Sequence, residues 1–206
     1  MAKHTYFITG ISTEVGKTVA SAIITEALEA DYWKPIQAGD LEHSDTHKVK
    51  DFVSNTKTQF HPNAFSLNTP MSPHASAEID GVHIKASEIK RPKTKNHLVI
   101  EGAGGLLVPI NDTETILDLI DAEDRVIVVS RHYLGSINHT LLTINKLKQA
   151  GKTVFGILFS GAEHPTTEAV IKKMSGVPVL GRIDEEPYFD RMVVKEYADS
   201  LKESLQ

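Results

Sequence analysis

The chain has 206 residues, a formal net charge of −5 and a predicted pI near 6.0. This balance gives no basic footprint, so binding to nucleic acid through phosphate neutralisation is not expected. Cysteine is absent, which excludes thiol catalysis and thiolate metal sites and fits a reducing compartment. No apolar run approaches the roughly 18 to 20 residues of a membrane span, and the N-terminus has no signal-peptide pattern. We expect one domain over residues 1–206, located in the cytoplasm, without membrane or nucleic-acid partners.

Short apolar runs alternate with helix-like stretches along the chain, which predicts a doubly wound α/β fold. In this P-loop NTPase type of architecture, a mostly parallel sheet carries helices on both faces. The expected strands are Tyr6–Thr9, Tyr32–Lys34, Leu98–Glu101, Arg125–Ser130, Thr153–Phe159 and Val177–Leu180.

Helical spacing of apolar residues is clearest in Lys17–Ala30 and Asn138–Ala150, and Gly151 follows the second as a stop signal. Between about Asp40 and Lys95 the pattern loosens, so this stretch is expected to form loops or short helices over one edge of the sheet. The tail Tyr197–Gln206 is interpreted as a short terminal helix or a frayed end.

The strongest local motif is Gly10-Ile11-Ser12-Thr13-Glu14-Val15-Gly16-Lys17-Thr18, between the first expected strand and the first expected helix. In this position backbone N–H groups at the helix start face an anion, Lys17 reaches phosphate oxygens and the Thr18 hydroxyl can bind Mg²⁺. Five residues instead of four separate Gly10 from Gly16, so the match to the usual phosphate-loop pattern is inexact. The alternative is an ordinary strand-to-helix turn.

Three charged residues are candidates for the same site. Glu101 ends an expected strand before a glycine-rich run and could share Mg²⁺ with Thr18. Asp45 could also bind the metal, although an N-cap or turn Asp would look the same. Lys34 lies at the end of another strand, where doubly wound folds bind ligands, and could neutralise a phosphoryl group during transfer. The ordinary interpretations are a solvated strand-end acid for Glu101 and a surface lysine for Lys34.

Taken in order along the chain, these pieces resemble the dethiobiotin synthetase family. The resemblance is carried by Thr9–Ala20, Lys34-Pro35, Ser72-Pro73-His74, Val99–Gly105 and Leu134–His139. The long loop ending in Thr-Glu-Val-Gly-Lys-Thr is itself typical of that family. The resemblance implies that CO₂ converts 7,8-diaminononanoate to a carbamate, that ATP phosphorylates the carbamate, and that the second amine closes the ring.

The same resemblance implies the roles of individual residues. Lys17 and Lys34 are the expected catalytic residues, and Thr18, Asp45 and Glu101 are the expected Mg²⁺ ligands. The expected ATP site comprises Glu14, Val15, Gly16, Lys17, Thr18, Val19, Glu101, Gly102, Ala103, Gly104, Ser160 and Gly161. The expected substrate site comprises Thr13, Lys34, Ala38, Gly104, Gly135, Ser136 and Asn138, with Gly135–Asn138 opening a helix that receives the substrate carboxylate across a homodimer interface.

Three departures from the family pattern concern the nucleotide base and the substrate. Ser160 stands where the family often has Asn, and one hydroxyl cannot reproduce the paired donor and acceptor of an amide. Ile183-Asp184-Glu185 lacks the Ile-Pro often found near the base. Ala38 replaces a hydroxyl residue that commonly follows the catalytic lysine. We predict only a weak preference for ATP over other nucleoside triphosphates.

Other functions fit the sequence less well. A partition or positioning ATPase shares the fold and Mg²⁺ chemistry, but such proteins typically have a lysine early in a shorter loop, where Ile11 and Ser12 stand here. An amide-forming synthetase would need an ammonia source, and the chain has no cysteine for a glutaminase. His43 and His47 have helical spacing without a third metal ligand, and His74 and His139 are interpreted as structural.

Overall fold

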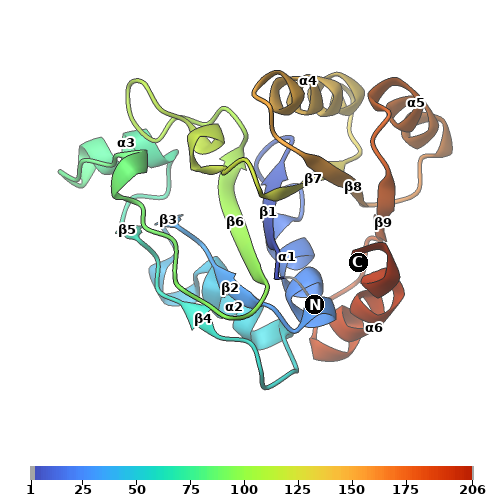
Figure 1. Cartoon of the computed structure of the whole chain (residues 1–206), viewed down its shortest axis with the longest axis horizontal. Helices are drawn as coiled ribbons and strands as arrows, with labels where there is room; N and C mark the ends of the chain where they lie inside the picture. The colour runs from blue at the N-terminus through green and yellow to red at the C-terminus, as the bar shows by residue number, and fades with distance from the viewer. Residues whose placement is uncertain (1–2, 206) are drawn as a thin grey trace.

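The computed structural model describes residues 3–205 (Figure 1). These residues form two sheets, and the strands within each sheet are parallel. The larger has seven strands in the order β4-β2-β6-β1-β7-β8-β9, and all neighbouring strands in it are parallel. Its strands are β1 (Thr5–Gly10), β2 (Asp31–Trp33), β4 (Phe60–His61), β6 (Leu98–Gly105), β7 (Arg125–Arg131), β8 (Val154–Ser160) and β9 (Val179–Ile183). The prediction of a doubly wound α/β fold is confirmed.

Helices cover both faces of this sheet. Figure 1 shows α4 and α5 on one side of the sheet and α1 and α6 on the other. The helices are α1 (Lys17–Leu28), α2 (Asp45–Phe52), α3 (Pro73–Ile79), α4 (Ser136–Gln149), α5 (Pro165–Ser175) and α6 (Arg191–Leu201). The chain winds from β1 towards β2 and later from β6 towards β7, so the direction reverses around β1. Ligands in such sheets bind beyond the strand ends at this reversal.

Several predicted boundaries were wrong by a few residues. Strand β6 continues to Gly105, because the ladder with β1 extends to a Gly10–Gly105 pair. Helix α4 begins at Ser136, two residues before the expected start, since Gly135 adopts a left-handed conformation with φ 106° and serves as its N-cap. The last strand is shifted to Val179–Ile183.

The segment of loose pattern contains more regular structure than expected. It holds α2, α3 and the short 3-10 helices η1 (Leu41–His43) and η2 (Ala86–Glu88). It also holds β4 at one edge of the large sheet, while β5 (Phe65–Leu67) pairs with β3 (Ile36–Ala38) in a second, two-stranded sheet. These strands have two or three residues each, too short for an alternating pattern to show in the sequence.

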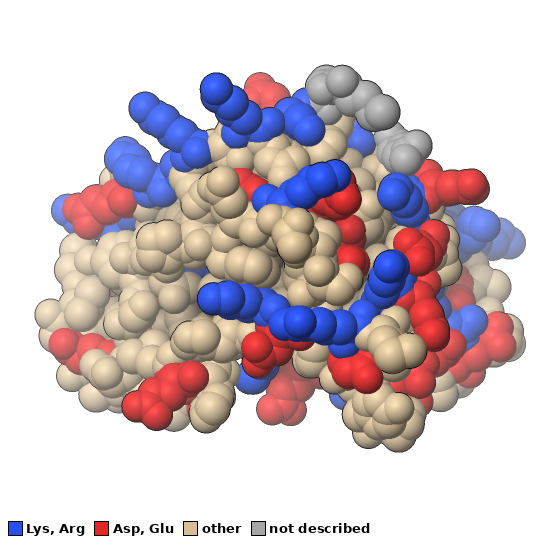
Figure 2. Space-filling model, turned by 90° about the horizontal axis from the view of Figure 1, so that it is seen from below, with Lys and Arg blue, Asp and Glu red and all other residues tan. Residues whose placement is uncertain are grey.

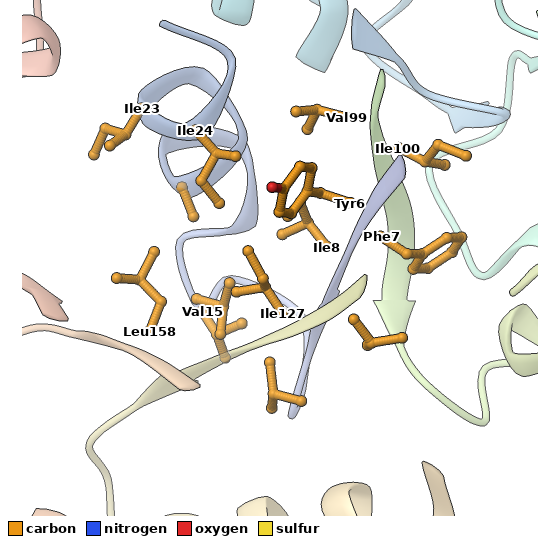
Figure 3. Close-up of a cluster of buried hydrophobic side chains, with 14 of the residues drawn as sticks. Tyr6, Phe7, Ile8, Val15, Ile23, Ile24, Val99, Ile100, Ile127 and Leu158 are labelled. Carbon is orange, nitrogen blue, oxygen red and sulfur yellow. The ribbon is translucent and has the colours of Figure 1, made fainter. Parts of the chain in front are cut away.

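The core lies between the central strands and α1. Figure 3 shows Tyr6 and Ile8 of β1 directed towards Ile24 of α1, with Phe7 on the opposite face of the strand. This alternation follows from the two-residue repeat of a strand, and it is possible on both faces because helices cover both. Each fully buried Ile or Phe side chain contributes about 1.5–3 kcal/mol relative to exposure. The packed sheet therefore gives the loops at its end a rigid support.

The C-terminal tail packs back on this core. After α6, the 3-10 helix η4 (Lys202–Leu205) places the carbonyl of Leu205 2.8 Å from the Tyr6 hydroxyl, which donates to it. Another 3-10 helix, η3 (Ile116–Leu119), packs against β6. Gln206 lies outside the described residues, so the expected tail is a helix as far as Leu205.

Among residues 3–205, no helix is long and apolar enough to cross a membrane. On the face in Figure 2, Lys and Arg side chains lie among Asp and Glu side chains, separated by uncharged surface.

Candidate functional site

A large cleft opens at the carboxyl ends of the parallel strands. It has a volume of about 1140 Å³, enough for a nucleotide and a second small molecule. Predicted site residues supply a large part of its lining, namely Thr13, Glu14, Gly16, Lys17, Thr18, Val19, Lys34, Ala38, Asp45, Glu101, Ala103, Gly104, Ser160 and Gly161. Residues that follow β1 and β2 and residues of β6 and β8 thus meet at one end of the sheet, because parallel strands end there together.

The turn between β1 and α1 has the backbone features of a phosphate-binding loop. Gly16 is the N-cap of α1, with φ 92°, and a Cβ built on it would lie 2.8 Å from Ser160 Oγ. Only glycine fits this position without strain. Glu14 also has a positive φ of 57°. The α1 N-terminus therefore presents unpaired N–H groups and the positive end of its dipole to the cleft.

Lys17 is held inside this loop. Its Nζ donates to the Ser12 carbonyl at 3.1 Å, and the residue is only 7% exposed. Burial lowers the pKa of the Lys17 ammonium to about 8, although the nearby Glu101 carboxylate partly opposes this change. The ammonium is thus desolvated before any ligand binds, and an anion in the loop would compensate it.

A carboxylate cluster faces the loop from β6 and α2. The Glu101 carboxylate is 1% exposed and accepts through Oε1 from the Thr18 hydroxyl at 3.0 Å and from Lys34 Nζ at 3.1 Å. Lys34, which directly follows β2, also forms an ion pair with Asp45 at the start of α2. One ammonium therefore lies between two carboxylates.

The neighbouring charges shift the pKa values of Lys34 and Asp45. Burial alone would lower the pKa of Lys34, but the Glu101 and Asp45 carboxylates outweigh it and raise that pKa. Burial likewise favours the neutral form of Asp45, and the Lys34 charge outweighs it, so the pKa of Asp45 is lowered. The pair is ionised at neutral pH, and Lys34 provides a permanent positive charge beside the phosphate loop.

The oxygens of this cluster suit a hard divalent cation. Thr18 Oγ1 and both carboxylates converge on the space beside the loop, and Mg²⁺ prefers oxygen ligands that are completed by phosphates and water. In the structure the Lys34 ammonium pairs with both carboxylates and neutralises part of their negative charge. Within residues 3–205, no group of three or more His, Asp or Glu side chains could hold a metal alone, so a hydroxyl and phosphate oxygens would have to complete this one.

Two groups of predicted site residues do not line the cleft of this chain. Gly135, Ser136 and Asn138 lie at the N-terminus of α4, where Gly135 and Asn138 are exposed. The Val15 side chain packs in the core (Figure 3), which leaves only its backbone for a ligand. Gly102 is enclosed within β6, where an added Cβ would lie 3.2 Å from Ile116. Its role in the structure is close packing.

Some residues around the site were not predicted from the sequence. The Tyr32 hydroxyl donates to Glu101 Oε2 at 2.8 Å, and the Gln37 side chain accepts from the Asp45 backbone N–H at 3.3 Å. Burial raises the pKa of Tyr32 well above its usual value, and the Glu101 charge adds to this. Strand alternation could have indicated that Tyr32 lies near the site, since Tyr32 and Lys34 are two residues apart and so share a face.

The far end of the cleft is lined by Arg131, Ser160 and Asp184–Glu186. Arg131 NH2 lies 3.1 Å from Glu185 Oε1, and the side chains of both residues are about half exposed or more. Such an exposed ion pair contributes about 0–1 kcal/mol, so it can open for a ligand at little cost.

The four histidines considered in the sequence have structural surroundings. His47 completes a capping box with Ser44 at the start of α2, and His43 ends the 3-10 helix η1. The Nδ1 atom of His139 lies 2.8 Å from the Tyr133 hydroxyl, and that of His74 lies 3.1 Å from the Ser72 hydroxyl.

Two proteins of similar sequence share the same name. A family model described as an AAA domain matches residues 4–193. The chain is 68% identical over 200 residues to the ATP-dependent dethiobiotin synthetase BioD of Christiangramia forsetii, covering 97% of each chain. It is 48% identical over 198 residues to the ATP-dependent dethiobiotin synthetase BioD of Cytophaga hutchinsonii, covering 95% of this chain and 96% of the relative.

Two solved structures with the same fold are named as cell-division proteins. The septum site-determining protein MinD of Pyrococcus horikoshii, complexed with Mg-ADP, matches with a TM-score of 0.64 over 100% of this chain and 95% of its own. The cell division ATPase MinD of Pyrococcus furiosus matches with a TM-score of 0.65 over 98% and 99%. Both are 14% identical to this chain, so the likeness concerns the fold alone.

Proposed function

The chain belongs to the ATP-dependent dethiobiotin synthetase family, and on that premise we propose which residues perform each part of the reaction. The protein is a ligase that forms dethiobiotin in an ATP-dependent reaction. We propose that it acts on 7,8-diaminononanoate and CO₂ as one domain, in the cytoplasm, with Mg²⁺. The observation that carries the assignment of residues is the buried ammonium of Lys34, placed beside the phosphate loop between two carboxylates.

The triphosphate lies over the α1 N-terminus in this proposal. The backbone N–H groups from Glu14 to Val19 bind its oxygens, and Lys17 contacts the β- and γ-phosphates. Thr18, Asp45 and Glu101 would hold Mg²⁺, which would neutralise phosphate charge when bound. The Lys34 ammonium, buried beside Glu101, provides positive charge to the reacting groups.

The chemistry requires positioning and charge neutralisation more than acid–base groups. One amine of the diamine attacks CO₂ and loses a proton, which gives a carbamate. A carbamate oxygen attacks the γ-phosphorus, and ADP leaves. The second amine then attacks the carbonyl carbon and loses a proton, and phosphate leaves, which closes the ring. Lys34 and Lys17 stabilise the negative charge of the carbamate and of the transferring phosphoryl group.

The diamine lies on the side of the cleft formed by Thr13, Ala38 and Gly104 in this proposal. Support comes from the proximity of Thr13 to Gly104, where an added Cβ would lie 3.6 Å from Thr13 Oγ1. We propose that the substrate carboxylate is bound by the α4 N-terminus of a partner subunit in a homodimer. The exposed apolar side chains Leu134 and Ile137 at this helix start support such an interface.

The nucleotide base is proposed to lie towards Ser160 and Gly161, at the end of β8. The lining here includes the Ser160 hydroxyl, Arg131 and the acidic segment Asp184–Glu186. Without an amide that pairs with adenine, we expect ATP to be only weakly preferred over other triphosphates. Strict dependence on ATP would contradict this expectation.

The deciding experiment measures phosphate release from ATP and Mg²⁺, with and without 7,8-diaminononanoate and bicarbonate, and identifies the product by mass. Lys34→Ala should lose diamine-dependent release. Lys48→Ala is the matched control, because Lys48 lines the same cleft and pairs with Asp45 at 3.7 Å, yet its side chain is 47% exposed. Release that does not depend on the diamine would contradict the proposal and would favour a switch ATPase.

A further inference from the structure

Tyr32 is a completely buried tyrosine whose hydroxyl reaches the candidate metal site. It lies in β2, next to β6, and is 0% exposed. Its register partner is Val99, which is two residues before Glu101 and therefore on the same face of the sheet. The Tyr32 hydroxyl donates to Glu101 Oε2 at 2.8 Å. A hydroxyl in a fully buried strand needs such a partner, and this one ends on a candidate metal ligand.

The two oxygens of Glu101 have different partners. Oε2 accepts from Tyr32, whereas Oε1 accepts from Thr18 and Lys34 at the cleft. Rotation of the carboxylate would exchange these oxygens only by breaking the Tyr32 hydrogen bond. An unpaired oxygen of a buried carboxylate costs more than the about 1–3 kcal/mol of a neutral group, so the observed orientation is strongly preferred.

We propose that Tyr32 is a positioning residue that keeps Glu101 with Oε1 directed at the divalent cation beside Thr18. The inference rests on the proposed Mg²⁺ site. Ligating carboxylates depend on outer hydrogen bonds for their orientation, and loss of such a partner typically weakens metal affinity 10- to 100-fold.

The test is Tyr32→Phe, which removes the hydroxyl and retains the ring that packs near Phe60, at a centroid distance of 6.1 Å. Tyr6→Phe is the matched control. Tyr6 is also in the large sheet and 1% exposed, but its hydroxyl donates to the Leu205 carbonyl and accepts from Arg125, away from the cleft. Both variants lose one buried hydroxyl, so a general loss of stability affects both.

The readout is Mn²⁺ binding in the presence of a non-hydrolysable ATP analogue, followed by electron paramagnetic resonance. We expect Tyr32→Phe to weaken Mn²⁺ binding about 10-fold or more and Tyr6→Phe to leave it within about 2-fold of the wild type. In turnover, Tyr32→Phe should require correspondingly more Mg²⁺ for half-maximal rate and recover kcat at saturating Mg²⁺. Unchanged Mn²⁺ affinity, or equal losses in both variants, would overturn the inference.

A second comparison tests whether Tyr32 acts through Glu101. In a Glu101→Gln background, adding Tyr32→Phe should weaken Mn²⁺ binding no further, because the oriented carboxylate is already gone. A full additional loss would assign Tyr32 a separate role and refute the positioning argument. Since Mn²⁺ binding is measured without turnover, it distinguishes failure of this inference from failure of the proposed reaction, which appears as diamine-independent phosphate release in the wild type.

Discussion

Replacing Lys17 by Met should stabilise the ligand-free protein. Burial lowers the pKa of Lys17 from its usual 10.5 to about 8, and each pKa unit corresponds to about 1.4 kcal/mol. Keeping this ammonium charged in the folded state therefore costs about 3 kcal/mol near neutral pH. Loss of the hydrogen bond to the Ser12 carbonyl offsets about 1 kcal/mol. We expect a net gain of about 2 kcal/mol, or roughly 4–8 °C in Tm for a chain of this size.

The stability difference between Lys17→Met and the wild type depends on pH. Because the folded-state pKa is lower than that of the unfolded chain, the unfolded state binds more protons between pH 8 and 10.5. The wild type therefore becomes more stable, relative to Lys17→Met, as the pH rises through this window. Between pH 7 and 9.5 the advantage of the variant should shrink by about 2 kcal/mol.

The assay is urea unfolding of the wild type and Lys17→Met at pH 7 and at pH 9.5, without nucleotide. Lys48→Met is the control, since it makes the same change at an exposed lysine of the same cleft and should show no comparable pH effect. ATP with Mg²⁺ should raise the Tm of the wild type and not that of Lys17→Met. An equal stability difference at both pH values, or a less stable variant at pH 7, would refute the reasoning.

Three further substitutions test other parts of the site and fold. Gly16→Ala would place a Cβ 2.8 Å from Ser160 Oγ at a residue with positive φ. We expect this variant to be about 1–3 kcal/mol less stable and to bind ATP more weakly by calorimetry. An ATP affinity equal to that of the wild type would contradict this expectation. Ser160→Asn supplies an amide donor and acceptor for the base. It should raise the kcat/KM preference for ATP over other triphosphates about 10-fold, which corresponds to about one additional hydrogen bond. An unchanged kcat/KM ratio would place the base elsewhere. Arg91→Met removes the bidentate partner of Asp124, which is 2% exposed. The free energy of unfolding in urea should fall by about 3 kcal/mol. A fall of less than about 1 kcal/mol would mean that the carboxylate finds another donor.

The family resemblance and the central fold followed from the sequence because both depend on local patterns. Buried parallel strands appear as short apolar runs, and a glycine-rich turn before Lys17-Thr18 is typical of phosphate loops wherever it stands between strand and helix. Residues at strand ends, such as Lys34 and Glu101, could be placed near one another because parallel strands end at one edge.

The tertiary structure decided which of these groups touch. Nothing in the local sequence shows that Lys34 pairs with both Asp45 and Glu101, because these contacts span many residues and depend on how α2 packs. The same holds for the hydrogen bond from Tyr32 to Glu101, since strand order places β2 beside β6 only in the folded sheet. Residue types and spacing thus determined the kinds of chemistry available, and the packing of distant segments determined which oxygen faces the cleft and which is held by the tyrosine.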